Sequence, residues 1–537
     1  MLVSSNSNPS VLTISSPFVS CEYESTVNGF KYPETVKTDA PVLESETGFL
    51  NIGGCCITLI HQIKNRAEIR LCLREAVVDK TRKCVAVLIM IGTLIIFFIP
   101  PSGGLNREAI RVGALVLFSM GFWATGVLPE YLTALIFMLA GMIFKVAPAP
   151  VIFSGFFSGA LWLVFGGLVI ASAVKSTGFD QRLSGWLAAV PITSYAGIIG
   201  GMFLLTMLLS FFIPSTMGRV ILLVPLATAM SDRLGLSADT GRKGMVLAAT
   251  LGSFVPAAAV LPANVPNMVL AGAAETLYDL SFGYGTYLKL HYPVLGVMKG
   301  LVTVFLICRL FPDRIRPVSS PQGAATKPLG VSEMVLVVIL SGTLLLWGTN
   351  FLHGVSPAWV ALAAALFCML PFTGIFPGGV FNQGINFGPF FYVGGVLRIV
   401  TLINRTGLGD FFGSRLIDLI GLQPGHDIRN FLSLCLVSTA LSPLTTPPGV
   451  VAVLAPLSAK ISTVTGFPLM TVLMTQVIGF SNVILPYHVP PIVVGLQVGG
   501  VSARDAARLT LSLCAASTFI LMPINYLWWH WLGVFGP

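Results

Sequence analysis

The stretch Leu-Pro-Ala-Asn-Val-Pro-Asn-Met-Val, residues 261–269, lies in the middle of an apolar segment. It occurs again, altered, as Leu-Pro-Tyr-His-Val-Pro-Pro-Ile-Val at residues 485–493. Two prolines four residues apart cannot lie in an unbroken helix, because each removes an N–H donor and clashes with the preceding turn. Irregular backbone at membrane depth is tolerated only where protein covers it or where it lines a cavity. Paired broken helices in the two halves of a chain therefore point to the binding site of a transporter.

The amino-acid composition indicates an integral membrane protein. Of the 537 residues, 55% are hydrophobic and only 10% are charged, whereas a soluble domain is about one quarter charged. We therefore predict a polytopic protein in the lipid bilayer of a plasma (inner) membrane. The net charge of +9 is explained by the excess of Lys and Arg in cytoplasmic loops, so no nucleic-acid partner is expected.

Four segments are predicted along the chain. Residues 1–83 form a disordered and basic segment in the cytoplasm, because basic side chains just before a first span hold the N-terminus on that side. Residues 84–310 form a first membrane repeat and residues 331–537 a second. Residues 311–330, which carry further basic side chains, are a cytoplasmic linker between the repeats.

Each repeat contains a predicted re-entrant hairpin, at about residues 197–232 and 430–462. The apolar runs in these segments are too short to cross a bilayer alone, since about 20 residues are needed. Polar tips separate the runs: Pro-Ser-Thr-Met-Gly-Arg at residues 214–219, and Leu-Thr-Thr-Pro-Pro-Gly at residues 444–449. We expect these tips to enter the membrane without crossing it.

The landmarks of the first repeat recur in the same order in the second. Thr-Gly-Phe-Asp at residues 177–180 corresponds to Thr-Gly-Leu-Gly-Asp at residues 406–410, and the tips and broken helices follow in turn. Five crossings plus a hairpin in each repeat insert the two copies in opposite orientations, as in secondary transporters. The predicted fold is an all-α polytopic membrane protein with two inverted repeats and about 11 spans. Its N-terminus is expected in the cytoplasm and its C-terminus outside.

From Cys84 onward the chain resembles the divalent anion–sodium symporter family, which includes dicarboxylate, citrate and sulfate carriers. The resemblance rests on the hairpin tips with their following Val-Pro and Ala-Pro pairs, and on the Val-Pro-Asn and Val-Pro-Pro loops of the broken helices. The chain departs from the family pattern because neither tip keeps the family's asparagine. The resemblance implies secondary active transport of a small anion by alternating access, most simply Na⁺-coupled di- or tricarboxylate or sulfate symport, in a homodimer.

A small anion that enters a dry site must exchange its water for hydrogen-bond donors, because an unpaired buried charge is very costly. Hydroxyl groups at the tips, amides at the breaks and the N-termini of half-helices can provide such donors. Arg219, three residues after Thr216 of the first tip, is expected to face the central cavity and to pair with the anion, since arginine inside the membrane is expensive. The full set of predicted substrate-binding residues is Ser215, Thr216, Arg219, Asn264, Asn267, Thr445, Thr446, His488 and Pro490.

The expected coupling ion is Na⁺, and no organic cofactor is predicted. Na⁺ prefers oxygen ligands, which unwound carbonyl groups and hydroxyl groups at the breaks can supply. The candidate positions are Ser210, Pro214, Val265 and Val489.

Other classes of function fit the sequence less well. A proton-coupled antiporter, or an arsenite or other anion carrier of the same superfamily, is expected to have acidic residues in the core, and we predict none there. A membrane enzyme needs a catalytic set, and the sequence contains no motif of that kind, so the protein is not expected to be an enzyme. A channel needs no inverted hairpins.

Overall fold

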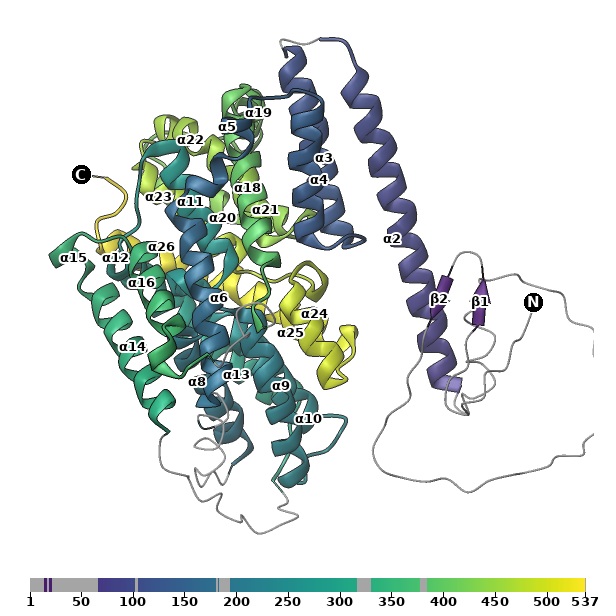
Figure 1. Cartoon of the computed structure of the whole chain (residues 1–537), viewed down its shortest axis with the longest axis vertical. Coiled ribbons are helices and arrows are strands. Elements are labelled where there is room, and N and C mark those ends of the chain that lie inside the picture. Colours follow the sequence, from purple (N-terminus) through teal and green to yellow (C-terminus); the bar gives the residue numbers. More distant parts are fainter. Residues whose placement is uncertain are drawn as a thin grey trace, which may run out of the picture. The chain divides into compact units, whose positions relative to one another are not determined.

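A computed structural model describes residues 14–16, 19–21, 66–101, 105–179, 182, 194–315, 330–376 and 384–536 of the chain (Figure 1). The chain divides into two compact units, Met1–Leu73 and Arg74–Pro537. In the first unit, β1 (Ile14–Ser16) and β2 (Val19–Cys21) pair as antiparallel strands. Most of the predicted disordered segment 1–83, and most of the predicted linker 311–330, lie outside the described residues.

The described part of the second unit is helical. Its first half consists of α2 (Arg66–Phe98, which begins in the first unit), α3 (Arg107–Thr125), α4 (Glu130–Ile143), α5 (Ala149–Ile152), α6 (Gly159–Thr177), α8 (Tyr195–Phe212), α9 (Thr216–Arg233), α10 (Gly241–Phe254), α11 (Val265–Tyr278), α12 (Tyr284–His291) and α13 (Lys299–Leu310).

The second half follows the same plan. It consists of α14 (Val331–Gly348), α15 (Asn350–His353), α16 (Pro357–Met369), α18 (Gly388–Arg405), α19 (Leu408–Ile420), α20 (Asp427–Leu441), α21 (Pro447–Leu454), α22 (Ser458–Thr465), α23 (Leu469–Phe480), α24 (Pro490–Gly499), α25 (Ala503–Ala516) and α26 (Met522–Trp531).

Eight helical stretches among the described residues are long and apolar enough to cross a membrane, and four shorter apolar helices accompany them. The prediction of an all-α polytopic membrane protein is therefore confirmed, while the number of about 11 spans stays a prediction. Side chains cap several helices at their N-termini: Asn106 accepts a hydrogen bond from the Ala109 N–H at 2.7 Å, and Ser194 accepts one from the Gly197 N–H at 3.1 Å. Such caps replace the missing partners of the first turn.

Both predicted hairpins are present. The first consists of α8 and α9, and the chain is extended at Ser215 between them. The second consists of α20 followed by α21 and α22, with a 3₁₀ turn at Ser442–Leu444 just before its tip.

Both predicted helix breaks are present as well. The first separates α10 from α11 and contains two 3₁₀ turns, Pro256–Ala259 and Leu261–Ala263. The second separates α23 from α24 and contains the turn Pro486–His488. In both breaks a proline stands within the first turn of the new helix, where its missing N–H costs nothing.

The two repeats have opposite orientations. Within the second unit, α8, α9 and α10 reach the lower end in Figure 1, whereas α22 and α23 lie at the upper end. The two hairpins therefore enter the protein from opposite sides, which confirms the predicted inverted repeats. Helices of the two repeats also pack directly on each other: a Cβ atom added at Gly166 of α6 would lie 2.8 Å from the carbonyl of Ala361 in α16.

Candidate functional site

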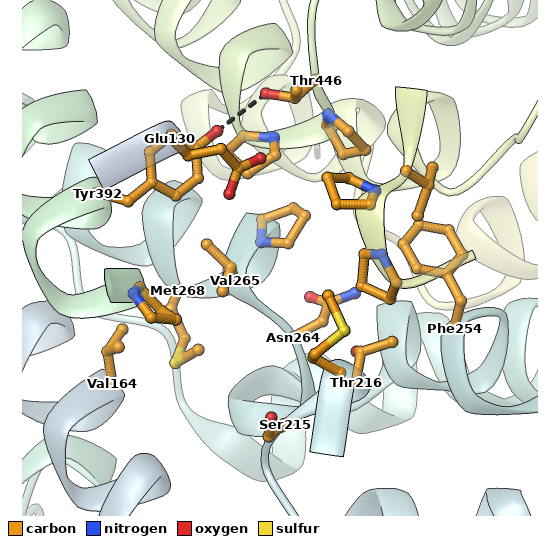
Figure 2. A pocket seen from close by; sticks show the side chains of 18 of the residues that line it. Glu130, Val164, Ser215, Thr216, Phe254, Asn264, Val265, Met268, Tyr392 and Thr446 are labelled. Carbon is orange, nitrogen blue, oxygen red and sulfur yellow. Dashed lines mark hydrogen bonds between the residues drawn. The ribbon is translucent and has the colours of Figure 1, made fainter. Parts of the chain in front are cut away.

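The two tips and the two breaks meet at one cavity of about 140 Å³ (Figure 2). Each repeat contributes one tip and one break, so segments far apart in the sequence form one wall. A cavity of this size is ample for a small ion together with a few water molecules. The tip and break residues that line it are Pro214, Ser215, Thr216, Met217, Asn264, Val265, Pro266, Thr446, Pro447, Pro448, Val489, Pro490 and Pro491.

At the first tip, the hydroxyl groups of Ser215 and Thr216 are held by the local backbone. Ser215 caps α9, because its Oγ accepts a hydrogen bond from the Gly218 N–H at 3.1 Å. Thr216 donates its hydroxyl proton to the Ala263 carbonyl of the first break at 3.3 Å. Both residues line the cavity as predicted, and Thr216 joins the first tip to the first break.

At the first break, Asn264 provides a donor that no group among the described residues uses. Its Oδ1 atom accepts a hydrogen bond from the Asn267 N–H at 3.2 Å and so caps α11. Its Nδ2 atom is buried beside the cavity and has no hydrogen-bond partner in the described part of the chain. A buried donor without a partner is costly, so this amide is suited to receive an oxygen atom of a bound anion.

Asn267 does not line the cavity. Its Nδ2 atom donates to the carbonyl groups of Ala257 and Val260 at 3.0 and 2.9 Å, while its Oδ1 atom has no hydrogen-bond partner within the described ranges. This side chain holds together the two 3₁₀ turns of the break. The structure therefore places it behind the cavity rather than in its wall.

At the second tip, Thr446 lines the cavity and forms a hydrogen bond of 2.9 Å with the hydroxyl group of Tyr392 in α18. The neighbouring Thr445 does not line it, and its hydroxyl points to the Met120 Sδ atom of α3 at 3.2 Å. Of the two predicted threonines, the structure therefore places Thr446 at the cavity.

At the second break, Pro490 begins α24 and lines the cavity. His488 lies just outside the lining. It is buried, and neither of its ring nitrogens has a hydrogen-bond partner among the residues that the structure describes. Its nearest aromatic neighbour is Tyr487, with ring centroids 5.8 Å apart.

Arg219 is fully buried but does not line the cavity. Its guanidinium group donates to the Ile213 carbonyl before the first tip and, at 2.7 and 3.3 Å, to the carbonyl groups of Ser253 and Ala263 at the first break. It also donates to Thr216 Oγ1 at 3.2 Å. In this structure the positive charge therefore lies within a cage of backbone oxygens directly behind the tip.

Three of the four Na⁺ candidates, Pro214, Val265 and Val489, line the cavity. Ser210 does not, because its hydroxyl group bonds to the Met207 carbonyl at 2.6 Å within α8.

A second buried cation, Lys299 of α13, lies at the second break. Its Nζ atom donates to the Ser481 carbonyl at 2.9 Å, to Ser481 Oγ at 3.1 Å and to Asn482 Oδ1 at 2.6 Å.

Two polar lining residues come from helices outside the tips and the breaks. They are Glu130, the first residue of α4, and Tyr392 of α18 (Figure 2). The prediction that no acidic residue lies in the core was therefore wrong. No local pattern marks Glu130 as a site residue, because it follows Pro129 at the end of an apolar loop and only the packing of α4 against α18 brings it to the second tip.

Comparison with known proteins decides the family. The sequence pattern described as "Sodium:sulfate symporter transmembrane region" matches residues 80–535. The chain belongs to this family. It is therefore an anion transporter that spans the membrane, as the resemblance of its tips and breaks implies.

Individual relatives of the transporter are distant. It is 23% identical over 469 residues to a membrane protein of Cupriavidus necator, a match that covers 82% of this chain and 91% of the relative. It is also 23% identical over 291 residues to dicarboxylate transporter 2, chloroplastic, of Spinacia oleracea, which covers 51% of each chain. The fold resembles the YdaH transporter of Alcanivorax borkumensis, with a TM-score of 0.52 and 13% identity over 80% of this chain and 100% of that chain.

The free amide of Asn264 leads to a first prediction. Replacing Asn264 with Asp keeps an oxygen that can cap α11, but it removes the only donor of this side chain and adds a negative charge to the cavity wall. We expect Asn264→Asp to weaken anion binding by more than about tenfold, or about 1.4 kcal/mol, with little change in melting temperature. Equilibrium binding of labelled anion to purified protein measures the first quantity. Equal affinity in the variant and the wild type would remove Asn264 from the site.

Proposed function

We propose that this transporter moves small divalent anions, of the dicarboxylate or sulfate class, across the membrane by secondary active transport. The convergence of both tips and both breaks on one cavity is the observation that supports this proposal most strongly. Alternate exposure of this cavity to the two sides of the membrane transports the anion. The substrate class draws support from the name of the spinach relative and from the description of the family.

The orientation and assembly are part of this proposal. Basic residues before the first span and between the repeats support a cytoplasmic N-terminus, with the C-terminus outside, in a plasma (inner) membrane. The resemblance to the symporter family supports a homodimer in which a fixed scaffold carries two moving cores.

Two coupling modes are consistent with this transport cycle. Na⁺ symport is the mode that the resemblance implies, with the cation held by backbone oxygens near Pro214, Val265 and Val489. Anion exchange without Na⁺ is the second, and the contacts of Arg219 and Lys299 favour it. Each of these side chains places a positive charge against oxygen atoms at one break. A bound Na⁺ would neutralise the same oxygen atoms, so the side chain can take its place.

The test is uptake of labelled succinate, citrate and sulfate into proteoliposomes. Vesicles are either empty or preloaded with unlabelled anion, and the external salt is either NaCl or KCl. Symport requires uptake into empty vesicles that depends on NaCl, whereas exchange requires preloading and is indifferent to the cation. The Asn264→Asp variant and protein-free vesicles are the controls. No uptake of any anion under any of these conditions would contradict the proposed function.

A further inference from the structure

The cavity contains an acidic side chain and no basic one. Glu130 lies on its wall beside Tyr392 and the second tip, across the cavity from Ser215 of the first tip (Figure 2). Within the described part of the chain, no hydrogen bond or ion pair engages the Glu130 carboxylate, and no Lys, Arg or His lines the cavity. The only other titratable residue in the lining is Tyr392, whose hydroxyl group is paired with Thr446 at 2.9 Å.

The charged groups on neighbouring helices do not reach this carboxylate. Arg111 of α3 donates to the Phe144 carbonyl at the opposite end of α4, and Arg398 of α18 donates to Ser154 Oγ at 3.0 Å. Arg405 of α18 lies 4.0 Å from Glu108 of α3. The full set of titratable or charged side chains on α3, α4 and α18 is Arg107, Glu108, Arg111, Glu130, Tyr131, Tyr392, Arg398 and Arg405, and α5 carries none.

A carboxylate in this position opposes the binding of an anion. Two like charges that share a poorly hydrated site cannot both remain ionised at low cost, so one of them takes up a proton. Glu130 is the group that can do so, because its carboxyl form is neutral and adds an O–H donor to a wall where donors are few. The amide of Asn264 and the carboxyl group of Glu130 would then bind two different parts of one anion.

We propose that Glu130 is the proton-binding group of the cavity and that an anion binds only together with a proton on this side chain. The proton comes from water when the anion enters and returns to water when the anion leaves. The deprotonated carboxylate then repels the anion and promotes its release. This inference rests on the proposed function, because it concerns the same cavity and the same anions.

The first test measures proton uptake by the wild-type protein and needs no variant. Sulfate is the probe, because it does not titrate near neutral pH. Addition of sulfate to purified protein in a weakly buffered solution with a pH-sensitive dye, at a pH where Glu130 is ionised before the anion binds, should remove about one proton per bound anion. Binding without proton uptake would overturn the role of Glu130.

The second test compares variants by the dependence of sulfate Kd on pH between 6 and 8.5. For the wild type, Kd should rise about tenfold for each pH unit once Glu130 is ionised. Glu130→Gln, which is neutral and of the same shape, should bind with a Kd that does not change with pH. Glu275→Gln is the matched control, because Glu275 bonds to Ser158 at 2.9 Å outside the cavity lining, and it should behave as the wild type does.

The outcomes separate the two proposals. Sulfate or succinate binding with the same pH dependence in Glu130→Gln and wild type would contradict the role of Glu130 alone. A sulfate Kd that changes with the Na⁺ concentration but not with pH would also contradict the role of Glu130. If no anion binds to either protein at any pH, the proposed function itself is wrong.

Discussion

Replacing Arg219 with Gln is expected to stop anion uptake in Na⁺-free medium and to destabilise the protein. The guanidinium group donates hydrogen bonds to the carbonyl groups of Ile213, Ser253 and Ala263. The shorter side chain of glutamine cannot donate to all three. Acceptors left unpaired in a buried site cost about 1–3 kcal/mol each, so we expect a loss of about 3 kcal/mol in unfolding free energy. The first tip then loses its fixed position beside the first break.

The variant also tests whether the charge of Arg219 replaces a cation. If it does, Arg219→Gln leaves a set of carbonyl oxygens that Na⁺ can occupy, and high NaCl should restore part of the uptake while KCl does not. Arg219→Lys is the matched variant, because it keeps the charge but loses the planar fork of donors. We expect it to retain more uptake than the glutamine variant in KCl. Wild-type uptake by Arg219→Gln in KCl would exclude Arg219 from any role in transport.

Replacing Gly166 with Ala is expected to cause the second large loss. A Cβ atom there would lie 2.8 Å from both the carbonyl carbon and the carbonyl oxygen of Ala361. Backbone atoms cannot swing aside, so α6 and α16 must separate, and overpacking of this kind costs about 1–3 kcal/mol. Val164 and Leu168, which lie on either side of Gly166 in α6, line the cavity, so the separation should reduce anion affinity as well.

The matched control for this prediction is Gly200→Ala in α8, where an added Cβ atom meets nothing within 4 Å. Thermal unfolding in detergent, followed by tryptophan fluorescence, compares the two variants with the wild type. Gly200→Ala should match or slightly exceed the wild type, because alanine favours helix. Equal melting temperatures for Gly166→Ala and Gly200→Ala would contradict the close packing of α6 on α16.

The sequence predicts correctly those parts of the fold where the local residues allow only one kind of backbone structure. Pro262 and Pro266 interrupt an apolar segment, and a break is the only local structure that accepts both. The polar tip at Ser215 and Thr216 separates two apolar runs too short to span. Because these signals occur twice in the same order, they also predict the inverted repeats and the convergence of tips and breaks.

The sequence could not predict which polar side chains face the cavity. Arg219 is one helical turn beyond Ser215, and its direction depends on carbonyl groups of a break that follows dozens of residues later. Thr445 and Thr446 are adjacent, and only the position of Tyr392 and Met120 distinguishes them. Glu130 reaches the cavity through packing between helices, which no local pattern records.

The central claim is that both repeats contribute to one anion site, and protection of single cysteines from thiol reagents tests it most directly. Nine native cysteines are first replaced, and one cysteine is then placed at Met217 of the first repeat or at Pro491 of the second, both in the cavity lining. Leu444→Cys is the control, because Leu444 is the exposed first residue of the second tip and does not line the cavity. Succinate or sulfate should slow labelling at both lining positions with the same half-maximal concentration and leave the control unchanged. Protection at only one position, or at neither while uptake persists, would contradict a single site shared by the two repeats.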